Sequence, residues 1–406
     1  MAPLWLAVAI PGCTGGDGGQ GSDDSDSDTD SGEGDDDDGT TCPTDAGTAC
    51  ATIGVRVDLY EPVFSNPTVV TNPLFPVSEL ASVVFTGVVG GEPFRTETTL
   101  LPYTTTLEWD GYRVEALTSQ YMAFSNGRIE EIAFDFYVQD DLGAVWYLGE
   151  DVSDYDADGV VYTNEGTWRV GRDGAPQTMI MPAEPQVGDV FLAENVAPIA
   201  WEEVTVVEVG AQVDGPDGPI AGAMIGSELH MDGTREQKVF APGHGEFSTG
   251  ALADDNLEAQ ALAIPADALA GPVEPELVAL ATATAGVYDA AAAGDWTAAS
   301  AALVQVDTAW AAFTAGSTPP RLTDELDRVL ALLDAGVTAQ DTHQATQNAI
   351  EVARIGYDLQ LRRRPPTEID AIRLDLWLAQ VAVDVAAGDA GSVRGDSATL
   401  DLVWIR

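Results

Sequence analysis

The chain has 406 residues, 45% of them hydrophobic, so it is long enough for two or three domains with a sizeable core. Its formal net charge is −50, and a surface this acidic repels nucleic acid and anionic lipid headgroups. We therefore expect no nucleic-acid partner. The acidity either reflects solubility in a salty habitat, which is the simpler explanation, or favours cations and basic partners.

The first 13 residues form a short apolar segment that ends in Ile10-Pro11-Gly12-Cys13. This ending resembles the tail of a bacterial lipoprotein signal, in which the cysteine carries the lipid. The segment lacks a basic start and is short for a signal peptide, so a soluble N-terminus with an incidental cysteine is the alternative. We expect a lipid on Cys13 that anchors the protein to a membrane of the bacterial cell envelope, either in the periplasm or at the surface.

The next segment, residues 14–53, is predicted to be a disordered acidic tether. Gly, Ser, Thr, Asp and Glu dominate 14–41, and such residues bury no apolar area. Calcium binding by these unspaced carboxylates is the alternative. Cys42 and Cys50 lie close together in the sequence, and in an exported chain this spacing favours a disulfide over a metal site.

Residues 54–250 are predicted to form an antiparallel β domain, either a sandwich or a barrel-like sheet. Short β-branched and aromatic stretches recur, and turn pairs such as Asn126-Gly127 lie between them. In Ile129–Val138 apolar residues alternate with Glu131 and Asp135. This period of two predicts a strand with one buried face.

The stretch Asp154–Glu165 has the spacing of a calcium loop: three acidic residues two apart, then a glycine, then a glutamate. Calcium takes about six to eight oxygen ligands, so alternate carboxylates must converge while the glycine turns the backbone. The predicted calcium ligands are Asp154, Asp156, Asp158, Val160 (through its carbonyl) and Glu165. The flanks indicate strands, whereas an EF-hand needs helices. We expect a β-hairpin that holds calcium, and an acidic, solvated turn without an ion is the alternative.

Several short patterns in this region resemble an extracytoplasmic β domain of uncharacterised bacterial exported lipoproteins. They are Asn72–Pro76, Val145–Asp151, Glu165–Trp168, Gly171–Ala175, Met181–Ala183, Val187–Asp189 and Phe240–Gly245. The segment Gly356–Asp370 is similarly typical of a helical domain of uncharacterised exported bacterial proteins. The resemblance implies a fold and a location, and it brings no catalytic residues.

Beyond Ala251 the alternation stops and alanine becomes frequent. Residues 251–273 are predicted to be a linker with one short helix, and 274–406 an antiparallel α-helical bundle, so the fold class is α+β and multidomain. Gly336 is expected to end one helix, and Asp295 and Thr338 to be N-caps. The expected helices are 274–293, 295–315, 320–336, 338–362, 366–387 and 390–404.

Polar residues recur at helical spacing on the fourth and fifth of these helices, and we call them the polar seam. Its members are His343, Arg354, Asp358, Asp370, Arg373 and Asp384. A polar face buried between helices must be fully paired, or it costs several kcal/mol. The seam is either a ligand or metal site between helices or a structural ion-pair network, such as Arg373 with an aspartate of the facing helix.

The sequence carries no G-x-S-x-G motif, no reactive cysteine left over and no glycine-rich phosphate loop, so we expect no enzyme. The predicted function is a lipid-anchored, extracytoplasmic, non-enzymatic binding or envelope-interaction protein with calcium in the 154–165 loop. The alternative is a small-molecule or metal carrier that uses the polar seam.

Overall fold

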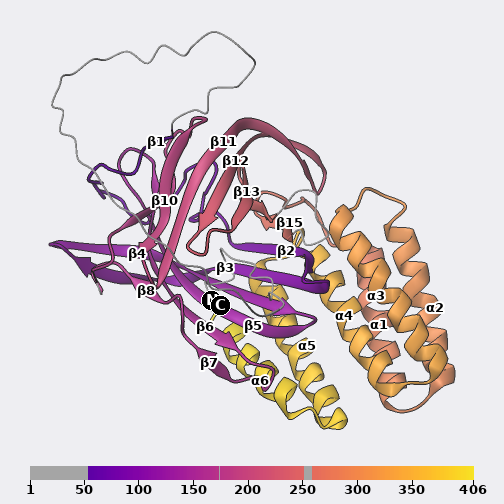
Figure 1. Cartoon of the computed structure of the whole chain (residues 1–406). Helices are drawn as coiled ribbons and strands as arrows, with labels where there is room; N and C mark the ends of the chain where they lie inside the picture. Colours follow the sequence, from indigo (N-terminus) through magenta and orange to yellow (C-terminus); the bar gives the residue numbers. More distant parts are fainter. Residues whose placement is uncertain (1–53, 173, 251–257) are drawn as a thin grey trace, which may run out of the picture.

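The computed structural model describes residues 54–172, 174–250 and 258–406 (Figure 1). The predictions for the N-terminal segment and the tether, including Cys13, Cys42 and Cys50, lie outside the described residues. Within them, a mostly antiparallel β region is followed by six helices. This confirms the predicted α+β class.

The β region contains fifteen described strands. In chain order they are β1 Val55–Arg56, β2 Ser82–Val89, β3 Glu92–Trp109, β4 Tyr112–Ser125, β5 Arg128–Gln139, β6 Val145–Tyr155, β7 Val161–Thr163, β8 Trp168–Arg169, β9 Thr178–Met181, β10 Asp189–Val196, β11 Ala200–Gly215, β12 Gly218–His230, β13 Arg235–Ala241, β14 Gly245–Thr249 and β15 Glu258–Ile264.

These strands join into one sheet in which most neighbours follow each other in sequence. The order is β1-β10-β11-β12-β13-β14-β15-β2-β3-β4-β5-β6-β7, with β8 and β9 also paired to β6. Only the β1–β10 pair is parallel among the described strand pairs. The sheet curls, so that β9 near one end lies beside β10 at the other, where Thr178 Oγ1 donates to the Ala193 carbonyl at 2.7 Å.

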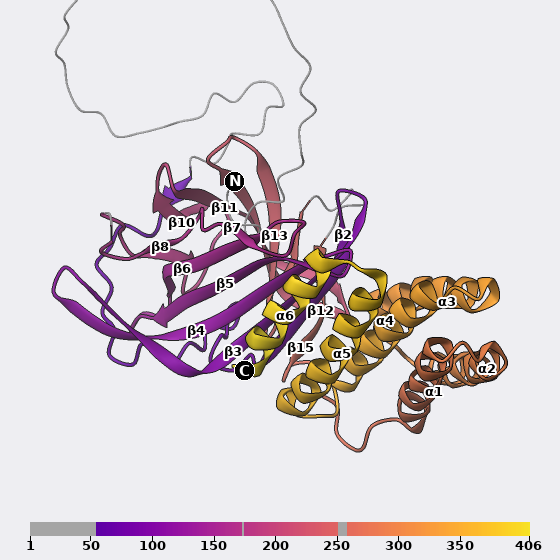
Figure 2. The ribbon, with the colours of Figure 1, turned by 90° about the horizontal axis from the view of Figure 1, so that it is seen from below.

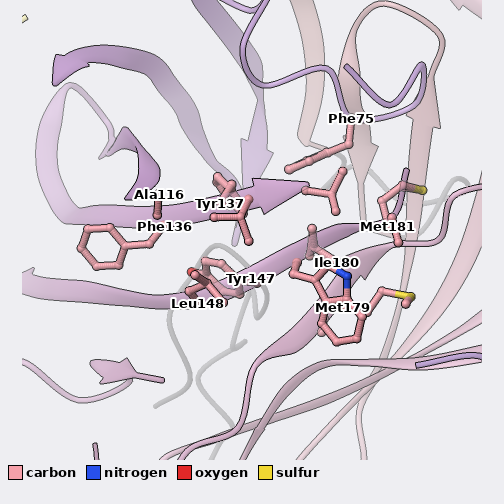
Figure 3. Close-up of a cluster of buried hydrophobic side chains, with 14 of the residues drawn as sticks. Phe75, Ala116, Phe136, Tyr137, Tyr147, Leu148, Met179, Ile180 and Met181 are labelled. Atoms are coloured by element: carbon pink, nitrogen blue, oxygen red, sulfur yellow. The ribbon is translucent and has the colours of Figure 1, made fainter. Parts of the chain in front are cut away.

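Aromatic side chains fill the inside of the curled sheet (Figure 3). Tyr137 stacks on Tyr147 with ring centroids 5.0 Å apart, and Phe75 meets Tyr137 edge-on at 5.2 Å. Met179, Ile180 and Met181 of β9 close the cluster. Burial of these large rings is the main source of stability here, since each aromatic side chain removes about 150–250 Å² from water.

Strand β5 is buried on both faces, so the prediction of a solvated face was wrong. Ile132 faces helices α5 and α6, which are described below, while Asp135 on the other face is fully buried and accepts a hydrogen bond from Tyr147 at 2.7 Å. The period of two is present. The polar residues line the interior of the curled sheet, where water is excluded.

Strand β15 lies inside the segment that was predicted to be a linker, and this prediction was wrong for residues 258–264. The strand pairs with β14 and β2 in the middle of the sheet. Leu262 packs against the helices, whereas Ala263 packs with Phe85 on the opposite face. A strand buried on both faces has no polar alternation, and its alanines are as typical of a helix.

The six helices match the expected ranges closely. They are α1 Pro275–Ala292, α2 Trp296–Phe313, α3 Pro320–Ala339, α4 Thr342–Gln360, α5 Pro366–Ala387 and α6 Ala390–Trp404. Asp295 is the N-cap of α2, as predicted, and accepts from the Ala298 N–H.

The boundary between α3 and α4 differs from the expectation. Thr338 lies inside α3, and Asp341 is the N-cap of α4. Gly336 does not end the helix. A Cβ there would lie 2.8 Å from the backbone nitrogen of Ala345, so this glycine lets α3 and α4 approach closely.

Helices α5 and α6 lie against β3, β4 and β5, and α3 contacts β2 and β15, whereas α1 and α2 extend away from the sheet (Figures 1 and 2). Trp377 of α5 stacks on Phe124 of β4, and Val403 of α6 joins the same cluster. The helical region and the sheet therefore share a buried interface. No helix within the described parts of the chain is long and apolar enough to span a bilayer.

Candidate functional site

The acidic loop between β6 and β7 is a hairpin connection, as predicted, because β7 and β8 both pair with β6. Asp156 Oδ1 accepts the backbone N–H groups of Asp158 (2.9 Å) and Val160 (3.1 Å). The Val160 carbonyl accepts the Asp156 N–H at 3.0 Å. Two of the five predicted calcium ligands therefore already have partners within the loop itself.

The same loop docks on the start of α6. Arg394 Nε donates to the Asp158 carbonyl at 2.7 Å, and a Cβ on Gly159 would lie 2.3 Å from the Gly391 carbonyl oxygen. Gly159 also has φ +67°, which favours glycine. The glycine of the calcium-loop pattern is thus required by the turn and by the contact with α6, whether or not an ion binds.

The acidic side chains of the loop do not form a compact ligand set. Within the described residues, the group of three whose ligand atoms all lie within 4.8 Å of one another is Glu202, Glu228 and His230. Asp154 is half-buried, and burial, with Glu165 and Glu130 nearby, raises its pKa to about 6. Calcium binding here stays a prediction, and it requires Asp158 to turn from Arg394 toward Asp154.

Calorimetric titration with calcium tests that prediction. The wild type should release or take up heat at millimolar calcium, and the variant Asp156→Ala with Glu165→Ala should not, because it loses two ligands including the closing carboxylate. Arg394→Gln should bind calcium more tightly than the wild type, since it frees Asp158. No heat with wild type or with Arg394→Gln would rule out the site.

The polar seam divides into two parts, and the first is an ion network against the sheet. Arg373 Nη2 donates to Asp358 Oδ1 at 2.9 Å, and its Nη1 to Asp370 Oδ1 at 2.8 Å. Arg95 of β3 reaches Asp358 from the other side at 2.7 Å. The ion-pair alternative therefore describes Asp358, Asp370 and Arg373, with the sheet supplying partners that lie far away in the sequence.

Three arginines and three carboxylates balance in this network. Glu97 of β3 accepts hydrogen bonds from Arg95 Nη1 and Arg406 Nη1, each at 2.5 Å. Burial alone would raise the pKa of Glu97, but Arg373, Arg95 and Arg406 hold it well below the usual range. Because the side chains of all six residues are buried, each charge depends on the others for its solvation.

The second part of the seam lines a cavity between the helices and the sheet. Its volume is about 310 Å³, at the lower end of the range for small-molecule sites. Strands β3 to β5 and helices α3 to α6 all contribute to the wall. Arg354 and Asp384 lie in the buried wall, whereas His343 is an exposed lining residue.

Polar atoms in this wall lack partners. Among the residues that the structure describes, Arg354 Nη2, Gln380 Oε1, Glu325 Oε2 and Asp396 Oδ2 are buried without a hydrogen bond. A buried polar atom left unsatisfied costs about 1–3 kcal/mol, and more when the group is charged. The four atoms belong to residues that line one cavity, so a rotation of each side chain would let a polar ligand complete its hydrogen bonding.

The charges of the wall are mixed. Arg354 Nη1 donates to both carboxylate oxygens of Glu351 at 2.7 Å, which leaves the other terminal nitrogen without a partner. Burial and the neighbouring Asp384 raise the pKa of Asp396 to about 8. Burial also raises the pKa of Glu325 to about 7.

Trp377 gives the cavity an apolar side, but its ring is already covered. Phe124 stacks on it at 5.4 Å between centroids, and the Arg354 guanidinium lies 4.6 Å from its centroid. With its stacking surface engaged in this way, the ring is poorly placed to receive a sugar or a nucleobase. Hydrogen bonds and charges therefore decide what this cavity can hold.

Sequence reasoning missed the residues that the sheet and the other helices supply. Arg95 and Glu97 stand two apart on β3, and Glu325 and Asp396 belong to α3 and α6. The positions of these four residues within their strand and helices do not differ in pattern from those of surface residues. The acidity of the chain was a signal for Arg95, because acidic residues far outnumber arginines and an arginine therefore finds a carboxylate partner easily.

The sequence matches no known protein family, and comparison with curated proteins and with solved structures likewise gives no match.

Proposed function

We propose that this protein is a non-enzymatic binding protein that holds a small dipolar molecule, of the size and charge of an amino acid, in the cavity between its helices and its sheet. The observation that carries the proposal is the set of four buried polar atoms without partners in one cavity wall. A barrel-like sheet and a helical bundle then serve as the rigid frame that holds these groups in place.

The chemistry of the four atoms selects the ligand. Arg354 Nη2 offers a donor with positive charge, which suits a carboxylate. Glu325, Gln380 and Asp396 offer three acceptor oxygens, which suit the three N–H donors of an ammonium group. Asp396 is near enough to Arg354 for that charge to affect its pKa. A cationic donor and a group of acceptor oxygens in one wall suit an α-amino acid or a similar zwitterion.

The location is part of the proposal. The lipoprotein-like segment at residues 1–13 and the acidic tether at 14–53 support a protein anchored by a lipid outside the cytoplasm. The resemblance to uncharacterised exported lipoproteins supports the same location. A binding protein held at a membrane by a long tether can sample the surrounding space for a nutrient or a signal molecule.

Thermal unfolding in the presence of small molecules tests this function. The set contains the common α-amino acids, together with amines and carboxylic acids that carry only one of the two charges. At least one zwitterion should raise the melting temperature, because a ligand at a hundredfold excess over its Kd stabilises by about 2.7 kcal/mol. Single-charge analogues should have little effect.

Matched variants locate the effect. Arg354→Gln and Asp396→Asn should weaken binding of the stabilising zwitterion by about 10- to 100-fold, as expected for a lost charged hydrogen bond. Arg113→Gln, an exposed arginine on a distant hairpin, should leave binding unchanged. If no zwitterion stabilises the wild type, or if both cavity variants respond like the wild type, the proposal is wrong.

A further inference from the structure

A second group of buried polar residues lies on the inner face of β11, β12 and β13, separate from the cavity. Glu202 of β11 stands opposite His230 of β12, and Glu228 of β12 stands opposite Glu236 of β13. Glu228 and His230 are two apart, so both point to the same face of the strand. Cross-strand pairing therefore gathers these side chains at one place inside the sheet.

The three residues Glu202, Glu228 and His230 form a compact ligand set. One ligand atom from each lies within 4.8 Å of the others, and the residues are only 1%, 1% and 3% exposed. Ligands of one divalent ion lie about 3–3.5 Å apart, given metal–ligand distances near 2 Å. Small rotations of these side chains bring the ligand atoms from within 4.8 Å of one another to the separation that a bound ion requires.

The hydrogen bonding of His230 prepares it as a ligand. Its Nδ1 lies 3.0 Å from Glu202 Oε1, close to the separation of two ligands on one ion, so a metal can take the place of the proton between them. Its Nε2 has no hydrogen-bond partner among the described residues, and neither has Glu202 Oε2.

The carboxyl groups around Glu202, Glu228 and His230 outnumber the positive side chains, so this place can accept a cation. Lys238, the one lysine of the sequence, lies 3.3 Å from Glu228 and 3.4 Å from Glu246. One ammonium balances one of Glu202, Glu228 and Glu246, so the other two carboxyls need either protons or a cation. A divalent ion on Glu202 and Glu228 makes that pair neutral and leaves Lys238 to Glu246. Glu236 Oε2, 3.9 Å from His230 Nε2, is placed to accept the proton of that nitrogen and to orient the ring.

We propose that Glu202, Glu228 and His230 form a buried binding site for a divalent transition-metal ion, with zinc and manganese as the candidates. The imidazole ligand favours such ions over calcium and magnesium, which prefer oxygen alone. The site stabilises the sheet by replacing protons with a metal. It is independent of the proposed ligand cavity, so either one can fail without the other.

Metal titration of the chelator-treated full chain tests the site. The wild type should bind one zinc or manganese ion, seen by calorimetry and by elemental analysis after gel filtration, and should bind cobalt with a visible absorption band. Calcium should not compete at this site.

Three variants separate a built site from unspecific binding. His230→Gln and Glu202→Gln should each weaken zinc binding by at least about 100-fold, since even groups that only orient ligands contribute 10- to 100-fold. Glu108→Gln changes an exposed glutamate of the β3–β4 hairpin and should bind as the wild type does. If the His230→Gln variant does not fold, the zinc affinity of the Glu202→Gln variant tests the site on its own. Absence of transition-metal binding by the wild type, or wild-type affinity in Glu202→Gln, would overturn the proposal.

Discussion

The metal-free protein should be most stable near pH 5 and should lose several kcal/mol of unfolding free energy between pH 5 and pH 8. The cause is a set of buried acids inside the curled sheet. Burial is the main reason that the pKa of each is raised. The six acids are Asp135, Glu150, Glu194, Glu202, Glu228 and Glu246.

The sign follows from where the protons are bound. A buried acid with a raised folded pKa keeps its proton in the native state, while the unfolded chain loses it above pH 4 to 4.5 or so. Stability therefore falls as pH rises through that window, by about 1.4 kcal/mol per pH unit for each group. The upper end of this pH window is the pKa of the group in the folded protein, which is about 7 for Asp135 and about 8 for Glu228.

Two histidines modify this curve without reversing it. The pKa of His230 is lowered to about 4, so its contribution grows between pH 4 and about 6.5. Burial opposes the charge on His244, but hydrogen bonds to Asp267 and Pro242 raise its pKa, so its contribution is lost as pH rises above its usual value. The six acids outnumber the one histidine that acts against them.

Urea unfolding at constant ionic strength measures this dependence. The midpoint of the chelator-treated protein should fall steadily from pH 5 to pH 8. Zinc should flatten the slope if the metal site exists, because the metal takes the place of the protons of Glu202 and Glu228. A midpoint that stays level or rises over this range would show that the interior acids are ionised in the native state.

Replacing Arg373 by methionine should lower the free energy of unfolding by about 3–5 kcal/mol. The side chain is 2% exposed and contacts Asp358, Asp370 and Glu97, so its removal leaves three buried carboxylates with two arginines. Methionine keeps most of the volume. The loss therefore reports the uncompensated charge and not a void.

Arg113→Met is the matched control for this variant. Arg113 pairs with Glu108 on the surface, where both side chains are exposed, and its loss should cost less than about 1 kcal/mol. Urea unfolding of both variants, with unchanged slopes, gives the comparison. Equal effects of the two substitutions would mean that the buried network contributes no more than a surface pair.

Helices and turns could be predicted from the sequence where residues at their ends mark the boundary. Proline and glycine mark most helix ends correctly, and Asn126-Gly127 forms the predicted tight turn between β4 and β5, with positive φ at both residues. Strand β15 was missed, because its alanines and its two buried faces remove the alternation on which strand prediction depends. Gly336 was misassigned because a close helix contact and a helix end both require glycine.

The candidate sites were predicted only in part. Helical spacing placed Arg354, Asp358 and Arg373 on buried faces of α4 and α5, which the structure confirms. It could not show that these faces meet the sheet, since Arg95 and Asp358 are 263 residues apart in the sequence. Likewise, Glu202 and His230 come together only through the pairing of β11 with β12. Such pairings depend on topology, which local periodicity does not contain.

The proposed function requires that the cavity wall bind both ends of one small zwitterion. A crystal structure of the protein grown with a saturating zwitterionic amino acid, chosen as the one that raises the melting temperature most, tests this binding mode. We expect one molecule in the cavity, with its carboxylate on Arg354 and its ammonium group among Glu325, Gln380 and Asp396. A cavity that holds only water under these conditions, or a ligand bound elsewhere, would contradict it.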